Sequence, residues 1–253
     1  IQFITLLLWT EINYMTTIIN IEPGTFGTVR NGDMIGVANV VEHLRKINSN
    51  PTIQFHLKPG NISPDIHCQT FYEILLKMTN YFTKEVGTGS LPWRKVNVWD
   101  FRDISGDLVK IPNDAPMEKK IVIFPLFDAP YNLWRNWPTN LLPSLVDKFN
   151  TEEYKDYEKI ICKKGEPTEG CPFDGWRYST NFVQNYYHIT TSEIFVGGDT
   201  GSSHFAWSLD KGPKQLLYYG SSRGLIHTLP FHLLEGKGKM SNYWLDCEGT
   251  TWQ

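Results

Sequence analysis

The stretch Glu193-Ile-Phe-Val-Gly-Gly-Asp-Thr-Gly-Ser-Ser-His204 indicates the fold of this chain more clearly than any other part of it. Its apolar residues 194–196 are typical of a buried strand, and a glycine-rich turn follows them. Ser202 and Ser203 then begin a predicted helix, and residues 214–219 indicate the next strand. A strand, a turn, a helix and another strand in this order form the crossover unit of a parallel sheet.

The turn itself has the features of an anion-binding loop. Gly197, Gly198 and Gly201 allow the backbone to approach a ligand closely. The first turn of the predicted helix leaves amide N–H groups without intrahelical partners, and the helix dipole favours negative charge there. The sequence therefore predicts a phosphate site at residues 199–203.

The same residues 199–203, Asp-Thr-Gly-Ser-Ser, also form the signature of aspartic proteases. Catalysis in that class needs two carboxylates that share a proton, and a single chain must therefore carry a second Asp-Thr/Ser-Gly. The sequence contains no second one. Dimeric proteases take it from a partner, but they are short all-β chains with the motif near their start. The protease is therefore the less favoured hypothesis.

A second resemblance extends over more of the chain. The loop Asp199-Thr-Gly-Ser-Ser-His204 is followed by Phe-Ala-Trp-Ser-Leu209 and then by Tyr219-Gly-Ser-Ser-Arg-Gly-Leu-Ile226. This order resembles the C-terminal part of the heptosyltransferases, a family of GT-B glycosyltransferases. The family has an Asp-Thr/Ser-Gly-x-x-His loop, a small apolar helix, a strand and a Tyr/Phe-Gly turn in the same sequence. The resemblance implies a glycosyltransferase.

Composition and charge exclude several other classes of protein. The chain has 253 residues, enough for one large or two small domains. With 41% hydrophobic and 20% charged residues, it is typical of a globular protein and not of a disordered one. A net charge of -3 indicates no broad basic surface for nucleic acid. The four cysteines form no Cys-x-x-Cys pair, which argues against a zinc site.

Apolar periodicity predicts two successive alternations of strands and helices. The first has strands at residues 16–21, 52–57 and 96–99 and helices at 34–47 and 70–82. The second has strands at 120–125, 159–162, 194–196 and 214–219 and helices at 141–149, at 181–188 and from 202 onward. Such alternation predicts parallel sheets that are covered by helices on both faces.

Residues 102–120 are rich in Asp, Pro, Gly and Lys and lack a sustained period, so we interpret them as the connection between two lobes. The resemblance implies an N-terminal acceptor-side lobe at 15–117 and a C-terminal nucleotide-sugar-binding lobe at 118–253. Residues 1–14 are an extension whose status the sequence leaves open; its apolar start is too short to span a bilayer. The predicted fold class is α/β and GT-B-like, with two Rossmann-like lobes whose parallel sheets face a central cleft.

Asp33 lies where a loop with three glycines meets a predicted helix. One interpretation is a helix N-cap, a position where Asp accepts a backbone N–H bond. The resemblance favours another, because heptosyltransferases have Gly-Asp before an apolar helix, and that Asp is their catalytic base. Gly32 and Asp33 match this pair, which implies that Gly32 lies on the acceptor side and that Asp33 takes a proton from the acceptor hydroxyl.

The resemblance also implies roles for a cation and a carboxylate. Arg135 stands two residues before Trp137-Pro138, where the family has a cation that holds the donor diphosphate, usually Lys. A fixed cation there stabilises the negative charge of the departing phosphate. Glu166 corresponds to a Glu that binds the ribose, although Glu169 is an equally good candidate and an exposed loop carboxylate is the simpler interpretation.

Residues Asp199, Thr200, Gly201, Ser202, Ser203 and His204 surround the predicted phosphate site and are assigned to donor binding. Asp199 cannot attract phosphate by its charge, so we expect it to fix the turn or to contact a sugar. His204 donates to phosphate or is a packed, hydrogen-bonded histidine. Arg223 is expected on the acceptor side, the alternative being a solvated charge.

The resemblance implies an inverting glycosyltransferase. No Asp-x-Asp occurs in the sequence, which agrees with a metal-independent mechanism. The enzyme's expected partners are a nucleotide-diphosphate sugar as donor and a glycan or glycolipid as acceptor, with lipopolysaccharide core as the family default and a modified nucleic acid still open. No further cofactor is expected. The expected location is the cytoplasm, with peripheral contact at the inner face of the membrane left open. A non-catalytic nucleotide-sugar-binding protein is the main alternative.

Overall fold

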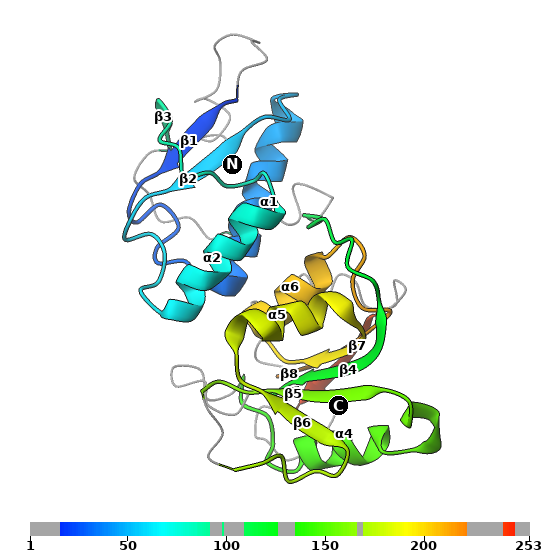
Figure 1. The fold of residues 1–253 in the computed structure, drawn as a ribbon. Coiled ribbons are helices and arrows are strands. Elements are labelled where there is room, and N and C mark those ends of the chain that lie inside the picture. Colours follow the sequence, from blue (N-terminus) through cyan, green and yellow to red (C-terminus); the bar gives the residue numbers. More distant parts are fainter. Residues whose placement is uncertain are drawn as a thin grey trace. The chain divides into compact units, whose positions relative to one another are not determined.

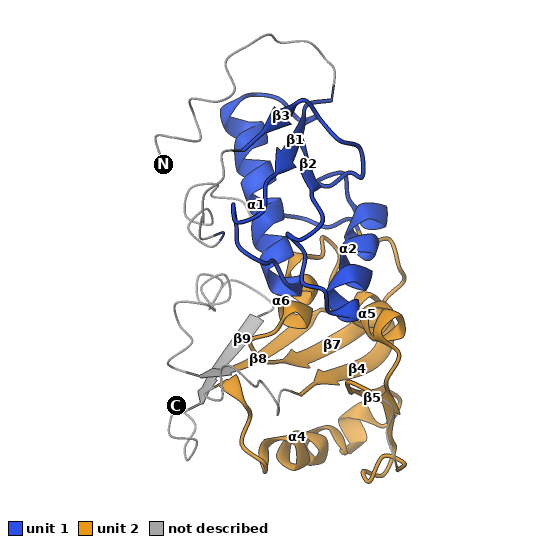
Figure 2. Cartoon of the chain, turned by 90° about the vertical axis from the view of Figure 1, so that its left-hand side faces the viewer, with its two compact units in different colours: residues 1–112 blue, residues 113–253 orange. Residues whose placement is uncertain are grey.

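A computed structural model describes residues 16–91, 98, 109–125, 135–165, 169–221 and 240–245. The chain forms two compact units, Ile1–Pro112 and Asn113–Gln253, which are coloured separately in Figure 2. The boundary predicted from the sequence lies between residues 117 and 118. In both units, helices are combined with strands whose described pairings are all parallel, which agrees with the predicted α/β class. None of the helices in the described ranges is long and apolar enough to cross a membrane.

The first unit contains a three-stranded parallel sheet in the order β2-β1-β3. Its strands are β1 (Ile18–Ile21), β2 (Gln54–Leu57) and β3 (Gly89–Ser90), and its helices are α1 (Asn31–Ile47) and α2 (Ile66–Met78) (Figure 1). The predicted order of strands and helices is therefore confirmed. The predicted strand at 96–99 lies outside the described residues except for Val98, which is not in a strand.

The short strand β3 is held by tertiary contacts rather than by a strand-like sequence. The side chain of Asn20 donates to the carbonyl of Gly87 at 2.7 Å and accepts from its N–H at 3.0 Å. A β-carbon at Gly87 would collide with the carbonyl of Ile18. Gly-Ser has low strand propensity, so no pattern in the sequence announces this strand.

The second unit contains a six-stranded parallel sheet in the order β6-β5-β4-β7-β8-β9. Its strands are β4 (Glu118–Phe124), β5 (Glu158–Cys162), β6 (Trp176–Ser179), β7 (Ser192–Gly197), β8 (Gln215–Ser221) and β9 (Met240–Leu245). Its helices are α4 (Leu141–Phe149), the short 3-10 helix η4 (Glu152–Tyr154), α5 (Phe182–Thr191) and α6 (Gly201–Ser208). The two strands at the edges of the sheet, β6 and β9, were not predicted from the sequence.

Helices cover both faces of this sheet. Figure 2 shows α4 on one face and α5 and α6 on the other. Ile121 and Ile123 of β4 point towards α4 and share its apolar cluster with Leu145 and Val146. Burial on both faces explains why the inner strands read as continuous apolar runs and not as alternating ones.

The order of the strands gives the second unit a topological switch point. Numbered along the unit, its strands lie in the order 3-2-1-4-5-6, the order of the doubly wound nucleotide-binding fold. The chain leaves β4 towards one edge of the sheet and leaves β7 towards the other. In such sheets the ligand crevice lies at the carboxyl ends of the two strands where the direction reverses. Here those strands are β4 and β7.

Candidate functional site

The carboxyl ends of β4 and β7 lie next to one another, with Phe124 paired with Gly197 in the last position of the register. The chain after β7 forms the predicted loop, Gly198 to Thr200, and then enters α6. The chain after β4 is described again from Arg135, shortly before α4. Residues from both loops meet at this edge of the sheet.

Arg135 and Asp199 form an ion pair across the switch point. Nε of Arg135 lies 2.9 Å from Oδ2 of Asp199, although the two are not aligned for a hydrogen bond. The Asp199 side chain is 3% exposed and that of Arg135 is 25% exposed. The carboxylate is therefore compensated inside the protein, while the Arg135 side chain stays partly exposed to solvent.

His204 approaches the same carboxylate from the first turn of α6. Its Nε2 lies 3.8 Å from Oδ1 of Asp199, and its side chain is 4% exposed. The helix bond from the N–H of His204 to the carbonyl of Thr200, at 3.2 Å, places the imidazole one turn above the loop. Arg135, Asp199 and His204, which the sequence analysis assigned to one site, are thus brought together.

Two hydroxyl groups at the start of α6 lack hydrogen-bond partners within the described part of the chain. They are Oγ1 of Thr200, which is the N-cap residue of α6, and Oγ of Ser203, whose residue is 3% exposed. A buried hydroxyl without a partner costs free energy, and most such groups bind protein, water or a ligand. The first turn of α6 also contains Gly201 and Ser202, whose backbone amides have no intrahelical partners. The two hydroxyls add further donors beside these amides.

The glycine pair before Asp199 makes room for protein side chains. A β-carbon at Gly197 would collide with Oγ of Ser203, and one at Gly198 would lie 2.7 Å from Nε1 of Trp137. From the sequence, these glycines were expected to admit a ligand; in the structure the space beside them is filled by Ser203 and Trp137. The contact between Trp137 and Gly198 was not predicted, although the position of Trp137 two residues after Arg135 indicated that it lies near the site.

Gly32 and Asp33 lie in the first unit, in the first turn of α1. The helix begins at Asn31 with Arg30 as its N-cap residue, so Asp33 is the third residue of the helix and not its cap. Its Oδ2 accepts the backbone N–H of Arg30 at 3.0 Å, which satisfies one of the donors at the helix start. Asp33 is partly exposed, and a catalytic role stays a prediction.

Two of the predicted site residues, Glu166 and Arg223, lie outside the described residues. Glu169, the alternative to Glu166, is exposed in the loop after β5. Within the described ranges, no group of three or more His, Cys, Asp or Glu side chains has an arrangement that could hold a metal ion.

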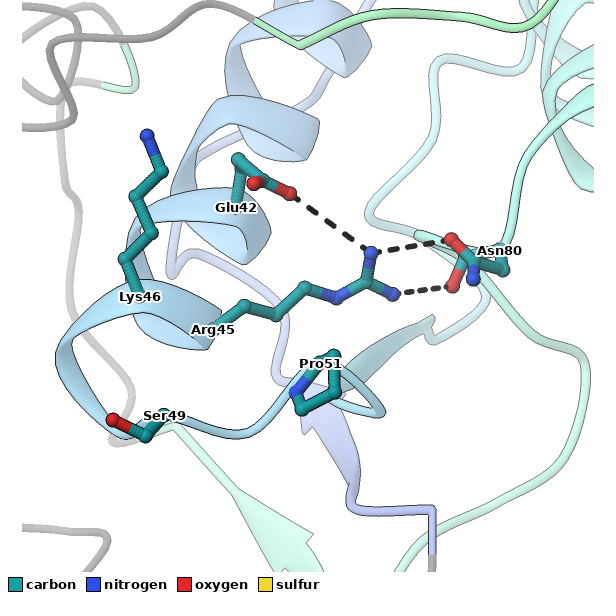
Figure 3. Close-up of a pocket in the computed structure, with 6 residues that line it drawn as sticks. All are labelled: Glu42, Arg45, Lys46, Ser49, Pro51 and Asn80. Carbon is teal, nitrogen blue, oxygen red and sulfur yellow. Dashed lines mark hydrogen bonds and ion pairs between the residues drawn. The ribbon is translucent and has the colours of Figure 1, made fainter.

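A separate hollow of about 490 Å³ lies in the first unit at the end of α1 (Figure 3). Its central side chain, Arg45, donates to the carbonyl of Ile53 and to the carbonyl and side-chain oxygens of Asn80. The guanidinium also lies over the ring of Tyr81, 4.7 Å from its centre. Arg45 thus ties the end of α1 to the loop around Asn80, which is a structural role.

No protein-family model matches the chain, and no curated protein matches it in sequence. Among solved structures, its fold is similar to that of E. coli heptosyltransferase WaaC with ADP. The identity is 12%, the match covers 81% of this chain and 88% of that chain, and the TM-score is 0.46. A likeness of this degree concerns the arrangement of helices and strands and carries no argument about activity.

Proposed function

We propose that this protein is a glycosyltransferase that moves a sugar from a nucleotide-diphosphate donor to an acceptor hydroxyl with inversion. The observation that supports it best is the Arg135–Asp199 pair at the switch point of the second unit, beside the first turn of α6. This is the edge at which doubly wound sheets bind nucleotides. The motif resemblance to the heptosyltransferases supports the type of reaction.

The diphosphate of the donor would bind at the start of α6. The amide groups of Gly201 and Ser202 and the hydroxyls of Thr200 and Ser203 would donate to its oxygens, as helix starts do for anions in general. The guanidinium of Arg135, whose side chain is partly exposed, would pair with the same oxygens. Because Asp199 already balances one positive charge, its role in this proposal is to hold Arg135 and to face His204, not to attract the ligand.

Sugar transfer places growing negative charge on the leaving diphosphate and needs a proton removed from the acceptor hydroxyl. Arg135, the amides of α6 and His204 would stabilise the negative charge on the diphosphate, because fixed donors need no reorganisation during the reaction. Asp33 would act as the general base that removes the proton from the acceptor hydroxyl. In this scheme the reaction is metal-independent, Glu166 or Glu169 binds the ribose, and Gly32 and Arg223 lie on the acceptor side; these roles rest on the sequence resemblance.

The acceptor in this proposal is a glycan or glycolipid in the cytoplasm, with lipopolysaccharide biosynthesis as the family default. The alternative is a non-catalytic nucleotide-sugar-binding protein, which would use the loop at Asp199 and have no need of Asp33. The structure argues against the aspartic protease hypothesis. Asp199 is paired with Arg135 beside a parallel sheet, whereas a protease carboxylate shares a proton with a second carboxylate in an all-β body.

The first experiment is a thermal-shift screen of the whole chain against UDP-, GDP-, ADP-, CMP- and dTDP-sugars. The donor that stabilises the protein most is then used to measure sugar transfer by the wild type, by Asp33→Asn and by Asp65→Asn. Asp65 is the matched control, because it also accepts a backbone N–H at a helix start in the first unit, from His67 at 2.8 Å. Loss of a general base lowers turnover about 10²- to 10⁴-fold.

We expect this loss in Asp33→Asn only, with unchanged donor affinity and near wild-type turnover in Asp65→Asn. Equal turnover in all three proteins would mean that Asp33 is not the base. Stabilisation by a nucleotide-sugar without any transfer would favour the binding protein. If no member of the panel stabilises the protein, a nucleotide-sugar donor is the wrong class of ligand.

A further inference from the structure

The indole of Trp137 is locked into the switch point from three sides. The side chain is 3% exposed, and its Nε1 donates to the carbonyl of Tyr219 at 3.2 Å. The two rings meet edge to face, with centroids 5.8 Å apart and an interplanar angle of 63°. The third side is the backbone of Gly198, which lies directly before Asp199.

Only glycine permits this contact at position 198. A β-carbon there would lie 2.7 Å from Nε1 of Trp137 and 3.3 Å from the carbonyl oxygen of Tyr219. Both distances are shorter than ordinary van der Waals contact, and the buried indole has little room to withdraw. The close approach of Trp137 therefore depends on the missing side chain of Gly198.

This contact brings together the two loops that carry the ion pair. Arg135 lies two residues before Trp137, and Asp199 lies one residue after Gly198. The contact between Trp137 and Gly198 therefore lies only one or two residues from the ion pair on each chain segment, and it fixes the backbone beside the 2.9 Å Arg135–Asp199 pair. We infer that Trp137 is a positioning residue, which places the Arg135 guanidinium for the diphosphate of a nucleotide ligand. This inference rests on the proposed function.

The physical benefit is preorganisation. An arginine side chain loses rotamer entropy when it is fixed on a ligand, and a side chain that is already fixed loses less on binding. Trp137 fixes the backbone at the base of the side chain, and Asp199 orients its guanidinium. If this is the role of Trp137, its contribution to ligand affinity must pass through Arg135 and vanish when Arg135 is removed.

A double-mutant cycle tests this dependence. The affinities of UDP, GDP, ADP, CDP and dTDP are measured by isothermal titration calorimetry for the wild type, and the tightest of them is the probe. The probe is then titrated into Trp137→Phe, Arg135→Ala and the double variant. Phe keeps an aromatic ring but removes the N–H that Tyr219 accepts. We expect Trp137→Phe to bind about five- to tenfold more weakly, the worth of one hydrogen bond in a fixed geometry. In the Arg135→Ala background the same change should alter the affinity less than twofold.

Trp176→Phe is the matched control. Trp176 is also buried in the apolar cluster of the second unit, and its Nε1 donates to Asn150 Oδ1 at 2.9 Å. It should lose thermal stability much as Trp137→Phe does, and keep the wild-type affinity. If Trp137→Phe does not fold, Trp137→Tyr takes its place in the cycle, because it also keeps an aromatic ring and removes the indole N–H.

The outcomes separate the inference from the proposed function. If none of the nucleotides binds the wild type, both are wrong. If the probe binds and Arg135→Ala weakens it, but Trp137→Phe or its substitute does not, the proposed function stands and the positioning role is refuted. A loss in the Arg135→Ala background as large as in the wild type also refutes it, because Trp137 would then act on folding or on the ligand directly.

Discussion

Replacement of Gly198 by alanine tests the packing at the switch point without any assumption about function. The added β-carbon would lie 2.7 Å from Nε1 of Trp137, and such contacts do not occur between relaxed atoms. The indole cannot move into solvent, because it is 3% exposed and is bonded to the carbonyl of Tyr219. The substitution therefore forces the indole or the loop out of place.

The expected loss has two parts. Overpacking of a close-packed interior costs about 1 to 3 kcal/mol. Breaking the hydrogen bond between the indole N–H of Trp137 and the carbonyl of Tyr219 costs about 1 kcal/mol more. Gly198→Ala should therefore lower the free energy of unfolding by about 2 to 4 kcal/mol, a large share of the roughly 5 to 15 kcal/mol of a typical protein.

The assay is urea unfolding followed by far-UV circular dichroism, because tryptophan fluorescence would itself change in the variants. Gly170→Ala is the control, since a β-carbon at Gly170 meets nothing within 4 Å; it should change stability by less than about 0.5 kcal/mol. A further comparison puts Gly198→Ala into Trp137→Phe. Because Phe lacks the nitrogen that the new β-carbon meets, the loss should fall below about 1 kcal/mol in that background.

Two results would contradict this reasoning. Wild-type stability of Gly198→Ala would show that the indole is not confined by the loop. Equal losses in the presence and absence of Trp137 would show that the clash lies elsewhere, for example with the carbonyl of Tyr219, 3.3 Å from the added atom.

Three further substitutions give independent tests. Lys120→Met removes ion pairs with Glu118 and Glu158 and a hydrogen bond to Thr191, and should cost about 1 to 2 kcal/mol by urea unfolding. This is less than the roughly 3 to 5 kcal/mol of a fully buried pair, because the two carboxylates are 45% and 43% exposed and stay hydrated; a loss above about 4 kcal/mol contradicts this. Burial, and then the cations of Lys120 and Arg177, lower the pKa of His188 below 6.5. Its contribution to stability is therefore present above pH 6.5 and lost as the pH falls through the lowered pKa. His188→Gln should flatten this part of a curve of stability against pH, and an unchanged curve would show that His188 is not responsible for it. Gly87→Ala should lower the free energy of unfolding by more than about 3 kcal/mol, because the new atom meets the backbone of β1 and not a movable side chain; near wild-type unfolding would rule this out.

Local sequence patterns were sufficient for the helices and inner strands of the second unit. The apolar periodicity at 141–149 predicted α4 with both of its ends correct, because its buried stripe faces one sheet along its whole length. Strand β7 was predicted at 194–196 and spans Ser192–Gly197, since a strand buried on both faces is continuously apolar. The helix at 181–188 was also predicted, and Asn181 caps it by accepting the N–H of Gln184.

Patterns failed where long-range contacts decide the structure. Strand β3 is only two residues of Gly-Ser, and Asn20 holds the adjoining Gly87. Strand β6 follows a loop rich in Gly and Pro, and its first residue, Trp176, is buried by packing on Phe149. One of the two interpretations of Asp33 was an N-cap, but α1 starts at Asn31; the earlier start was missed because Asn31 and Gly32 precede the apolar periodicity that marks the helix in the sequence.

For the candidate site, the amino-acid sequence by itself determined which residue types follow β7: two glycines, a carboxylate, hydroxyls and a histidine at the start of a helix. It did so because a strand, a tight turn and a helix start are local structures, each set by neighbours within a few positions. Only the tertiary structure decided that Arg135 pairs with Asp199 and that Trp137 fills the space beside Gly198. Those contacts join residues more than sixty positions apart, and they exist because the parallel sheet places the carboxyl ends of β4 and β7 side by side.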